Sequence, residues 1–558
     1  MASFVRESKL RQSAVTLTKK EQHYENLKVF QPPNDVNCVA GNSSFIAYID
    51  TTGTGSSLAV LPHTSTGKNH VPISSPAYAQ PIIRAHGQSV QDFDFNPFNQ
   101  HQIYTCSTDK TIKLWQIPEE GLVVDLSSPL VSMALQDQAP VRGLSPHPTT
   151  DGILAARGSR SVTLFDALNG KAISSTTGKS SSIPTSDLQS LTWSFRGDLL
   201  ATTAKDKLLR LFDPRLLGSD RETVITVPSH VGLRFSRTVW LGDSPYLLSC
   251  GHNNNQEREF MLWDSRRMEA GHVKRERVDA SYGPLLPLFD ADLNALVLMG
   301  KGDSSLRFYE FDALTGADGA VTAHALSNNT VGTGADVTKG ACLLPKQAND
   351  LMACEVLRVL KLTENAIQPV SITVPRKEKL KFHEDLYPPT LCETVPSATV
   401  AEYLAGENRP LSRIHITAAM GGAALAPRPG RARAPRPSAS PAWPPAASSA
   451  TCSVPRTLRT AATSAWRPTS AITNLEPACA LAKHTNSIRT VTFHPTVAGL
   501  LCSTAQDMTV RHFDVEQGAE AGCMSVPEAV TVNVSYNYDG SLLALAGKDR
   551  SVRIVDPR

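Results

Sequence analysis

The sequence predicts an all-β fold whose main part is a β-propeller of seven blades, formed by residues 1 to about 380. The first observation is residues 84–115, where three short apolar or alternating segments are separated by turn residues and closed by Trp115. The second is that this pattern recurs along the chain. The third is the regular spacing of the closing positions, every 46 to 51 residues from Trp115 to Leu360. Repeats of short strands at about this period are typical of propeller blades.

Each blade is expected from short strands bounded by turn residues. A single blade cannot bury both of its faces, so the fold requires several copies that cover one another. In the last blade we expect strands at residues 342–344, 351–354 and 356–360. The seven predicted blades, in chain order, lie within residues 38–61, 84–115, 145–166, 191–213, 238–264, 285–309 and 342–360.

Several polar and aromatic residues of these repeats are expected to have structural roles. The repeat resembles the WD40 type of blade, in which a histidine and a turn aspartate form buried hydrogen bonds that hold the blade together. Buried polar groups need partners, whereas a catalytic site needs convergent groups, which no spacing in this chain supplies. The positions concerned are His86, Asp109, Trp115, Asp206 and Trp263.

Composition indicates a soluble chain without a strong preference for nucleic acid. The 558 residues carry a net charge of only +3, so nothing in the charge balance demands nucleic acid or a membrane. The ten cysteines include no C-x-x-C pair, and Cys106, Cys250 and Cys354 fall on predicted strands, which indicates buried free thiols in a reducing compartment. No signal core or membrane-spanning apolar run occurs. We therefore expect a cytoplasmic protein without a transmembrane segment.

No motif in the sequence indicates an enzyme. Residues 176–180 (TTGKS) resemble the end of a phosphate-binding loop, but the glycine that this motif needs five residues before Gly178 is replaced by Ile173. Zinc-protease and nucleophile-elbow motifs are absent from the sequence. We expect no catalytic residues, no cofactor and no bound metal.

Two runs that follow the predicted ring are more specific. Residues 374–377 (VPRK) and 382–390 (FHEDLYPPT) strongly resemble the extension that follows the propeller of coronins, which are actin-regulating proteins with seven blades. Shorter matches agree with this resemblance, which covers residues 1 to about 415: residues 7–11 (ESKLR), 236–242 (SRTVWLG), 300–303 (GKGD) and 354–358 (CEVLR). The resemblance implies that residues 381–417 pack along the underside of the ring. Its expected anchors are Phe382, Leu386 and Tyr387.

Residues 418–470 differ in composition from the rest of the chain. They are rich in Ala, Pro, Ser and Arg, contain no Asp, Glu or Lys, and offer few apolar side chains to bury. Such a segment cannot form a core of its own. The sequence therefore predicts a disordered linker here.

The blade pattern returns in residues 471–558, where two further WD40 repeats are expected. The spacing from His484 to Asp507 equals that from His86 to Asp109, and Phe513 stands in the register of Trp115. A second set of blades resembles the long coronins, which carry two rings in tandem, but two blades leave open edges and cannot close a ring. Either the chain is a truncated product, or this incomplete second propeller docks onto something else.

The resemblance implies a non-enzymatic scaffold that binds actin filaments or the proteins that regulate them. Because actin has an acidic surface, a basic patch on the ring would steer the encounter and add affinity. The candidate partner-binding residues are Lys9, Arg11 and Lys28. Lys28 occupies a basic position of the family, although Phe30 and Gln31 stand where a second basic residue is usual. The simpler interpretation of these charges is a solvated strand edge.

Other functions remain open at this point. Long coronins are also associated with Golgi traffic, so a peripheral scaffold at Golgi membranes or vesicles is one alternative, and an adaptor for ubiquitin ligation is another. The expected location is cytoplasmic and associated with the cytoskeleton. Short coronins end in a coiled coil, whereas this sequence has no heptad run. We therefore expect a monomer.

Overall fold

The computed structural model contains two compact units, residues 1–432 and 433–558. The structure describes residues 8–30, 38–68, 80–135, 139–176, 184, 186–219, 224–232, 234–312, 314, 321–332, 336–378, 382–392, 394–416, 452–455, 477–481, 483–494, 497, 500–515, 519–525, 531–537, 542–549 and 551–556. Among these residues no helix has the length and apolar character needed to cross a membrane.

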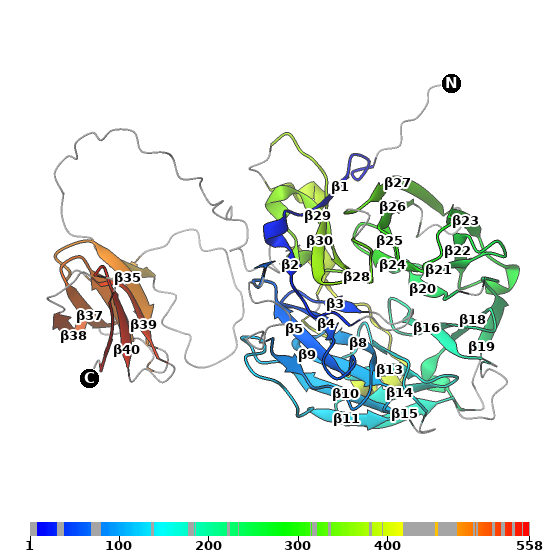
Figure 1. Ribbon diagram of the computed structural model, residues 1–558, viewed down its shortest axis with the longest axis horizontal. Helices are drawn as coiled ribbons and strands as arrows, with labels where there is room; N and C mark the ends of the chain where they lie inside the picture. Colours follow the sequence, from blue (N-terminus) through cyan, green and yellow to red (C-terminus); the bar gives the residue numbers. More distant parts are fainter. Residues whose placement is uncertain are drawn as a thin grey trace. The chain divides into compact units, whose positions relative to one another are not determined.

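The first unit is a ring of antiparallel sheets (Figure 1). Within its described residues seven sheets of blade type occur. Each of the first six has a fourth strand, on its outer side, that the sequence did not predict. The first blade comprises β3 (Val39–Gly41), β4 (Phe45–Asp50), β5 (Ser57–Pro62) and β7 (Ile82–Ile83), and the second comprises β8 (Val90–Asn96), β9 (Asn99–Ser107), β10 (Thr111–Gln116) and β11 (Val131–Ala134). The third comprises β12 (Gly143–Pro146), β13 (Ile153–Arg157), β14 (Val162–Asp166) and β15 (Lys171–Ser175), and the fourth comprises β16 (Leu188–Trp193), β17 (Leu200–Ala204), β18 (Leu208–Phe212) and β19 (Val224–Pro228). The fifth comprises β20 (Arg237–Trp240), β21 (Tyr246–His252), β22 (Arg258–Asp264) and β23 (Lys274–Asp279), and the sixth comprises β24 (Leu285–Asp290), β25 (Ala295–Gly300), β26 (Ser305–Asp312) and β27 (Thr322–Thr330).

The seventh blade joins the two ends of the ring. It consists of β28 (Gly340–Leu343), β29 (Glu355–Leu362), β30 (Ala366–Thr373) and, as its outer strand, β1 (Ala14–Leu17). The chain then continues along the same edge of β30 with β2 (Tyr24–Glu25), which also pairs with β6 (Gly67–Lys68). The innermost strands contact one another in sequence around the ring, and β28 contacts β3. The N-terminal segment therefore supplies the strand that holds the last blade to the first.

The predicted strands of the seventh blade were wrong in part. Residues 351–353 form a single 3₁₀ turn, capped by the Asp350 carboxylate, which accepts from the Ala353 amide at 3.2 Å. Cys354 follows with a φ of +55°, so it does not lie on a strand as predicted. Because the segment predicted as the second strand forms this turn, the second strand of the blade is β29 and the third is β30. Cys106 and Cys250 do lie on strands and are buried and free.

The blades are held together by apolar side chains between neighbouring sheets. Central strands such as β4 and β25 are buried along their whole length, as expected where both faces are covered. Phe93 and Phe95 of the second blade pack into the core shared with the first blade, and Ile112 and Leu114 pack into the core shared with the third. Each such buried side chain contributes about 1.5–3 kcal/mol.

The extension after the ring crosses from the last blades to the third and fourth. It contains η6 (Glu384–Leu386), β31 (Thr390–Leu391), α1 (Val400–Leu404) and β32 (Arg413–Ile414). Leu386 and Tyr387 are buried in the core of the sixth and seventh blades, and Phe382 stacks on Tyr387 with ring centroids 5.5 Å apart. The Tyr387 hydroxyl donates to the Leu351 and Glu355 carbonyls at 3.2 and 3.1 Å.

A second anchor lies at the far end of the extension. Tyr403 of α1 is fully buried against the third and fourth blades, where its ring meets His147 at 4.4 Å and the Arg215 guanidinium at 5.2 Å. An ion pair of 2.9 Å joins Arg413 to Asp292. This strap of about 35 residues therefore ties together blades that are far apart in the sequence.

The second unit contains two blade-like sheets in its described residues. The first comprises β35 (Ile488–Phe493), β36 (Leu500–Ala505), β37 (Thr509–Asp514) and β38 (Ala519–Ser525), and the second comprises β39 (Thr531–Tyr536), β40 (Leu543–Gly547) and β41 (Val552–Val555). They share a core that includes Cys502, Val534 and Leu545.

One further strand pair departs from the predicted linker. Residues Cys452–Pro455 form β33 and pair with β34 (Pro477–Leu481). A strand pair satisfies its backbone groups mutually and requires no large core of its own, so composition did not reveal it. The rest of residues 418–470 lies outside the described residues.

Candidate partner-binding site

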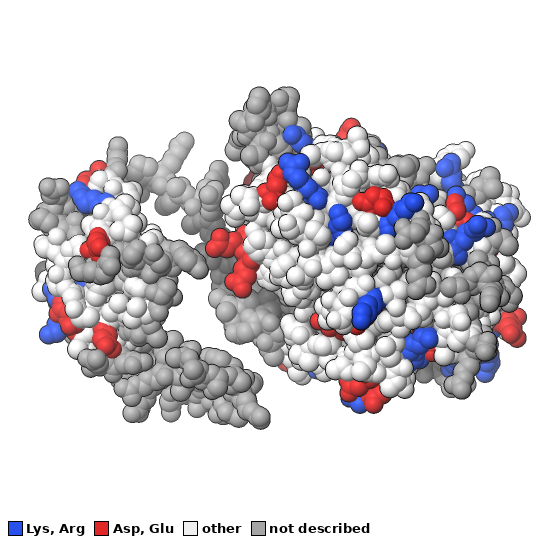
Figure 2. Space-filling view, turned by 90° about the horizontal axis from the view of Figure 1, so that it is seen from below, with Lys and Arg blue, Asp and Glu red and all other residues white. Residues whose placement is uncertain are grey.

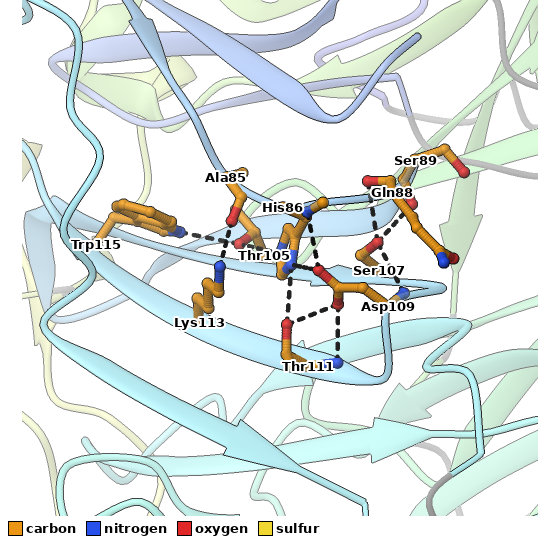
Figure 3. A network of polar contacts seen from close by, with 11 residues as sticks. Ala85, His86, Gln88, Ser89, Thr105, Ser107, Asp109, Thr111, Lys113 and Trp115 are labelled. Carbon is orange, nitrogen blue, oxygen red and sulfur yellow. Dashed lines mark hydrogen bonds and ion pairs between the residues drawn. The ribbon is translucent and has the colours of Figure 1, made fainter. Parts of the chain in front are cut away.

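The histidine and aspartate of the second blade form a closed hydrogen-bond network (Figure 3). His86 Nδ1 lies 2.9 Å from an Asp109 carboxylate oxygen, and His86 Nε2 lies 2.8 Å from the Thr105 hydroxyl. That hydroxyl also accepts from Trp115 Nε1 at 3.0 Å. Burial alone would raise the pKa of Asp109, but hydrogen bonds from His86 and Thr111 outweigh it and hold the pKa well below its usual range. The side chains of Trp115, Thr105, His86 and Asp109 therefore form a continuous series of hydrogen bonds within the blade.

The same arrangement recurs in the fifth blade with different residues. His230 Nδ1 lies 3.0 Å from Glu259, His230 Nε2 lies 2.9 Å from the Ser249 hydroxyl, and Trp263 Nε1 donates to that hydroxyl at 2.9 Å. In the second unit, His484 contacts Asp507 at 2.9 Å and Ser503 at 2.7 Å. The sequence reasoning found Trp263, His484 and Asp507 but missed His230 and Glu259.

Asp206 has a different partner from the one that the blade pattern suggests. Its carboxylate forms a buried ion pair with Arg210, with 2.6 Å between Arg210 Nη2 and Asp206 Oδ2, and no histidine takes part. One of its oxygens also accepts from the Leu208 amide at 3.1 Å. The same turn geometry, with the carboxylate accepting an amide two residues later, occurs at Asp109 and Asp507. The turn aspartates thus shape the hairpins.

The three N-terminal basic residues do not form one patch. The chain follows β30 along its whole length, from Ala14 opposite Thr373 to Glu25 opposite Ala366. A strand of eight residues spans about 25 Å, so Lys9 and Arg11 lie beyond one end of β30 and Lys28 beyond the other. Lys9 Nζ donates to the Asp385 carbonyl of the extension at 2.7 Å, and Arg11 is exposed.

Lys28 lines a shallow cleft against the first blade. Its carbonyl accepts from the Thr51 amide at 3.3 Å, and the neighbouring Val29 forms a bridge to Asp50. The cleft has a volume of about 330 Å³. We refer to it as the Lys28 cleft; it is lined by Lys28, Asp50, Thr52, Gln80, Pro81, Ile82, Arg84, Val123, Val124 and Asp125.

The Lys28 cleft combines charge with exposed apolar surface. Arg84 and Asp125 form an ion pair of 2.7 Å across it, and Asp125 also accepts from the Ile82 amide at 3.2 Å. Val123 and Val124 are 71% and 75% exposed, more than other large apolar residues of the described first unit except Tyr282. Adjacent exposed apolar side chains flanked by charges are typical of a docking surface.

Charge elsewhere on the first unit is mixed. On the face seen in Figure 2, basic and acidic side chains lie interspersed and no large area of one sign is present. In the part of the chain that the structure describes, no group of His, Cys, Asp and Glu could hold a metal ion. The residues Thr177 to Ser180 of the phosphate-loop-like stretch lie outside the described residues.

The sequence offered only weak signals for the residues of the Lys28 cleft. Val123 and Val124 follow a turn between blades, where an apolar pair has no core to fill. Their position in the sequence therefore indicates an exposed apolar surface. Arg84 and Asp125 are 41 positions apart and meet only because β7 places them together. For the fifth blade the signal was sharper, because His230 and Ser249 repeat the 19-residue spacing of His86 and Thr105.

Family models match three parts of the chain. The model described as a domain of unknown function (DUF1899) matches residues 3–68, which include Lys9, Arg11 and Lys28. A type of WD40 repeat matches residues 367–411, and the model of the WD domain, G-beta repeat, matches residues 79–116 and 171–213.

Known proteins resemble the chain over about three quarters of its length. It is 34% identical to Coronin-7 of Bos taurus, covering 73% of this chain but only 41% of that protein. It is 33% identical to Coronin-A of Dictyostelium discoideum and 32% identical to Coronin-2A of Homo sapiens, covering 85% and 76% of those proteins. The solved WD40 domain of a Toxoplasma gondii coronin has a TM-score of 0.64, is 30% identical and covers 73% of this chain and 97% of that structure.

Proposed function

The chain belongs to the coronin family, and from this membership we propose that it is an actin-associated scaffold that binds filaments through the Lys28 cleft. The ring serves as a rigid platform, and the contacts come from residues at its surface. No catalytic step is part of this function. Because the match spans about two fifths of Coronin-7, the proposal concerns the first unit and does not extend to every activity of the longer relatives.

The observation that carries the proposal is the position of Lys28 at a cleft with exposed apolar side chains. An acidic filament surface would meet the Lys28 ammonium, while Val123 and Val124 would lose their exposed area to the partner. Arg84 is already held by Asp125 and contributes mainly to the shape of the cleft. The interaction should therefore depend on salt only moderately, since one cation and an apolar pair share the contact.

Co-sedimentation of the full chain with actin filaments across a salt series tests this function. We expect pelleting that weakens with salt and a loss of affinity of roughly 2- to 30-fold for Lys28→Glu, because an exposed ion pair contributes about 0.2–1 kcal/mol and charge reversal adds repulsion of similar size. Replacing Val123 and Val124 by Ser should weaken binding as well and should leave the salt dependence unchanged.

The matched control is Lys171→Glu, which makes the same charge change at an exposed position of β15. It should pellet like the original chain. Equal losses for Lys28→Glu and Lys171→Glu would show that only net charge matters and would remove the Lys28 cleft from the proposal. Absence of pelleting at low salt would remove filament binding itself.

A further inference from the structure

A polar cavity lies on the axis of the ring, between the innermost strands of the blades (Figure 1). It has a volume of about 150 Å³, and its lining comes from the second to the sixth blade. One water molecule takes about 30 Å³ of the liquid, so the cavity has room for a small molecule. We refer to it as the axial cavity; its polar lining includes Asp92, Arg157, Gln189, Arg237 and Thr238.

The C-terminal extension lies across the opposite end of the innermost strands. Asp94, Pro146 and Phe289, near the ends of β8, β12 and β24, line a separate cavity there. Leu391 and Leu411 of the extension complete this second cavity. In the described structure, the entrance to the axial cavity is therefore the end at which the innermost strands begin.

Basic residues gather around this entrance. Three of them stand at the beginning of an innermost strand: Arg142 before β12, Arg237 in β20 and Lys339 before β28. Lys301 directly follows β25, which pairs antiparallel with β24, and so lies at the same level. Burial raises the pKa of the Cys38 thiol directly before β3, and all of these cations except Arg142 act against this rise. Their effect on one group shows that they lie close to one another.

Acidic residues near this end act mainly on cations outside the axial cavity. These pairs of charges are Asp187 with Lys205, Asp303 with Arg258, and Asp336 with Lys361. The entrance of the axial cavity is therefore positively charged among the described residues.

Two guanidinium groups and one carboxylate line the axial cavity itself. Arg157 Nη1 donates to the Leu188 carbonyl at 2.8 Å, and the Asp92 carboxylate accepts from the Leu144 amide at 3.2 Å. Burial lowers the pKa of the Arg157 guanidinium, and Asp92 offsets this effect only in part. Because a buried cation is costly without a counter-charge, an anion that enters beside Arg157 and Arg237 is stabilised.

A glycine makes room for the Arg157 guanidinium. Arg157 ends β13 and pairs with Gly143 at the beginning of β12. A Cβ atom at residue 143 would lie 2.5 Å from Arg157 Nε and 3.0 Å from its Cζ atom. The guanidinium thus lies directly over the glycine, and its position at the axis depends on the absence of a side chain there.

We propose that the axial cavity binds a phosphate group of a small soluble molecule between Arg157 and Arg237. Guanidinium groups match phosphate oxygens with two parallel hydrogen bonds. The two arginines come from the third and the fifth blade, so a group with three or four acceptor oxygens satisfies both, whereas a carboxylate offers only two. The Gln189 side-chain oxygen already accepts from the Ser236 amide and hydroxyl, at 3.1 and 2.8 Å, so this amide offers N–H donors.

The entrance cations indicate how many phosphate groups the ligand carries. Arg142, Lys301 and Lys339 lie beyond the lining of the axial cavity, where a second phosphate group would meet them. A diphosphate should therefore bind more tightly than a single phosphate. Such a ligand contacts several blades at once and stabilises the ring by mass action.

Thermal melts of the full chain, in phosphate-free buffer at an ionic strength held constant with chloride, test the proposal. Inorganic phosphate should raise the melting temperature of the first unit in a saturable manner. Pyrophosphate should act at a roughly 10-fold lower concentration, because one further charge-assisted contact contributes about that factor.

Four variants locate the binding site. Gly143→Ala leaves the charge unchanged and should fold, since the end of the Arg157 side chain can move aside. It and Arg237→Gln should each weaken pyrophosphate binding by roughly 10- to 100-fold, whereas Asp92→Asn removes the opposing charge and should strengthen it. The matched control is Gly87→Ala, where a Cβ atom meets nothing within 4 Å, and it should bind like the original chain.

Melts of the variants without phosphate report whether they are folded. A response no larger than that to chloride would show that the axial cavity holds only water and would overturn the proposal. Equal responses of the original chain, Gly143→Ala and Arg237→Gln would place the phosphate elsewhere and would overturn it as well. Because actin is absent, failure here is independent of the proposed filament binding.

Discussion

At the scale of single residues, the blade networks depend on a shared hydroxyl group. Thr105, Ser249 and Ser503 each follow their histidine by 19 positions and each contact its Nε2 atom. The acidic partner is less constrained, since Glu259 replaces the usual aspartate in a blade with a longer hairpin. The extra methylene of Glu259 reaches the same histidine nitrogen from a different position. The contacts of the two histidine nitrogens are thus the same in these blades, although the sequence spacing from the histidine to its acidic partner differs.

A second residue-scale feature is the ion network between the fifth and sixth blades. Asp279 accepts from Arg258 at 2.5 and 2.7 Å and from Arg307 at 3.0 Å. Arg258 also pairs with Asp303 at 2.8 Å and is almost fully buried. Burial alone would raise the pKa of Asp279, but hydrogen bonds from Arg258 and the Ser281 amide outweigh it and lower the pKa to about 2.

This network predicts a pH-dependent effect of Asp279→Asn. At pH 7 the change should destabilise the first unit by about 3 kcal/mol, because Arg258 loses its main buried partner. The folded pKa lies below the ordinary value of 3.8, so the carboxylate stabilises the fold fully above about pH 4 and loses this effect as the pH falls toward 2. Thermal melts of both proteins should show a difference in melting temperature that is constant from pH 7 to about pH 4 and becomes smaller at lower pH.

The matched control for Asp279 is Asp187→Asn, which removes an exposed pair with Lys205. It should change stability by no more than about 0.5 kcal/mol. If the difference in melting temperature between the original protein and Asp279→Asn stayed the same at low pH, the network would not act through the charge of Asp279.

At the scale of elements, closure of the ring depends on a very short strand. β1 has four residues, and only Val15 and Leu17 face the core of the sixth and seventh blades, while Thr16 points to solvent. Without β1 the edge of β30 would be open, and such an edge is a site for unwanted pairing. The first and last segments of the unit therefore stabilise each other.

Leu17→Asp should release β1 from the ring. A charge placed at this half-buried position costs about 2 kcal/mol, which corresponds to a fall of a few degrees in the melting temperature of the first unit. Thr16→Asp introduces the same group on the exposed side of the strand and should have little effect. Proteolysis within residues 8–30 reports release directly. Equal protection of both variants would mean that β1 is held by backbone pairing alone.

At the scale of the whole molecule, the chain has two compact units of unequal size, divided near residue 432. Residues 418–470 have the composition of a linker, with many arginines and few apolar side chains. Limited digestion with trypsin should therefore cut first in this range and leave a resistant fragment of residues 1 to about 415.

Digestion with elastase, which cleaves after alanine and other small residues, separates accessibility from arginine content. It should cut first in the same range, which is also rich in alanine. Early cuts by both proteases within residues 38–416 would contradict the assignment of a single stable ring to the first unit.

The sequence by itself determined the all-β class, the seven repeats and the family. The all-β class and the repeats follow from local patterns, because strand alternation, turn residues and the spacing of the closing positions all act within one blade. The family followed from the resemblance of residues 374–377 and 382–390 to the coronin extension. The anchors Phe382, Leu386 and Tyr387 were named in advance because the resemblance implied that this segment packs on the ring. Lys28 was identified as a candidate by resemblance.

Only the tertiary structure decided how the ring closes and what surrounds Lys28. The outer strand of the seventh blade comes from residues 14–17, and no local pattern can reveal a partner more than 350 positions away. The shift of the seventh blade to β29 and β30 has the same cause, since Asp350 and Cys354 form a turn inside an apolar run that reads as a strand. Lys28, Arg84 and Val123 form one cleft because three segments meet beside the first blade. Periodicity records which face of a strand is covered, but the partner that covers it is set by long-range packing.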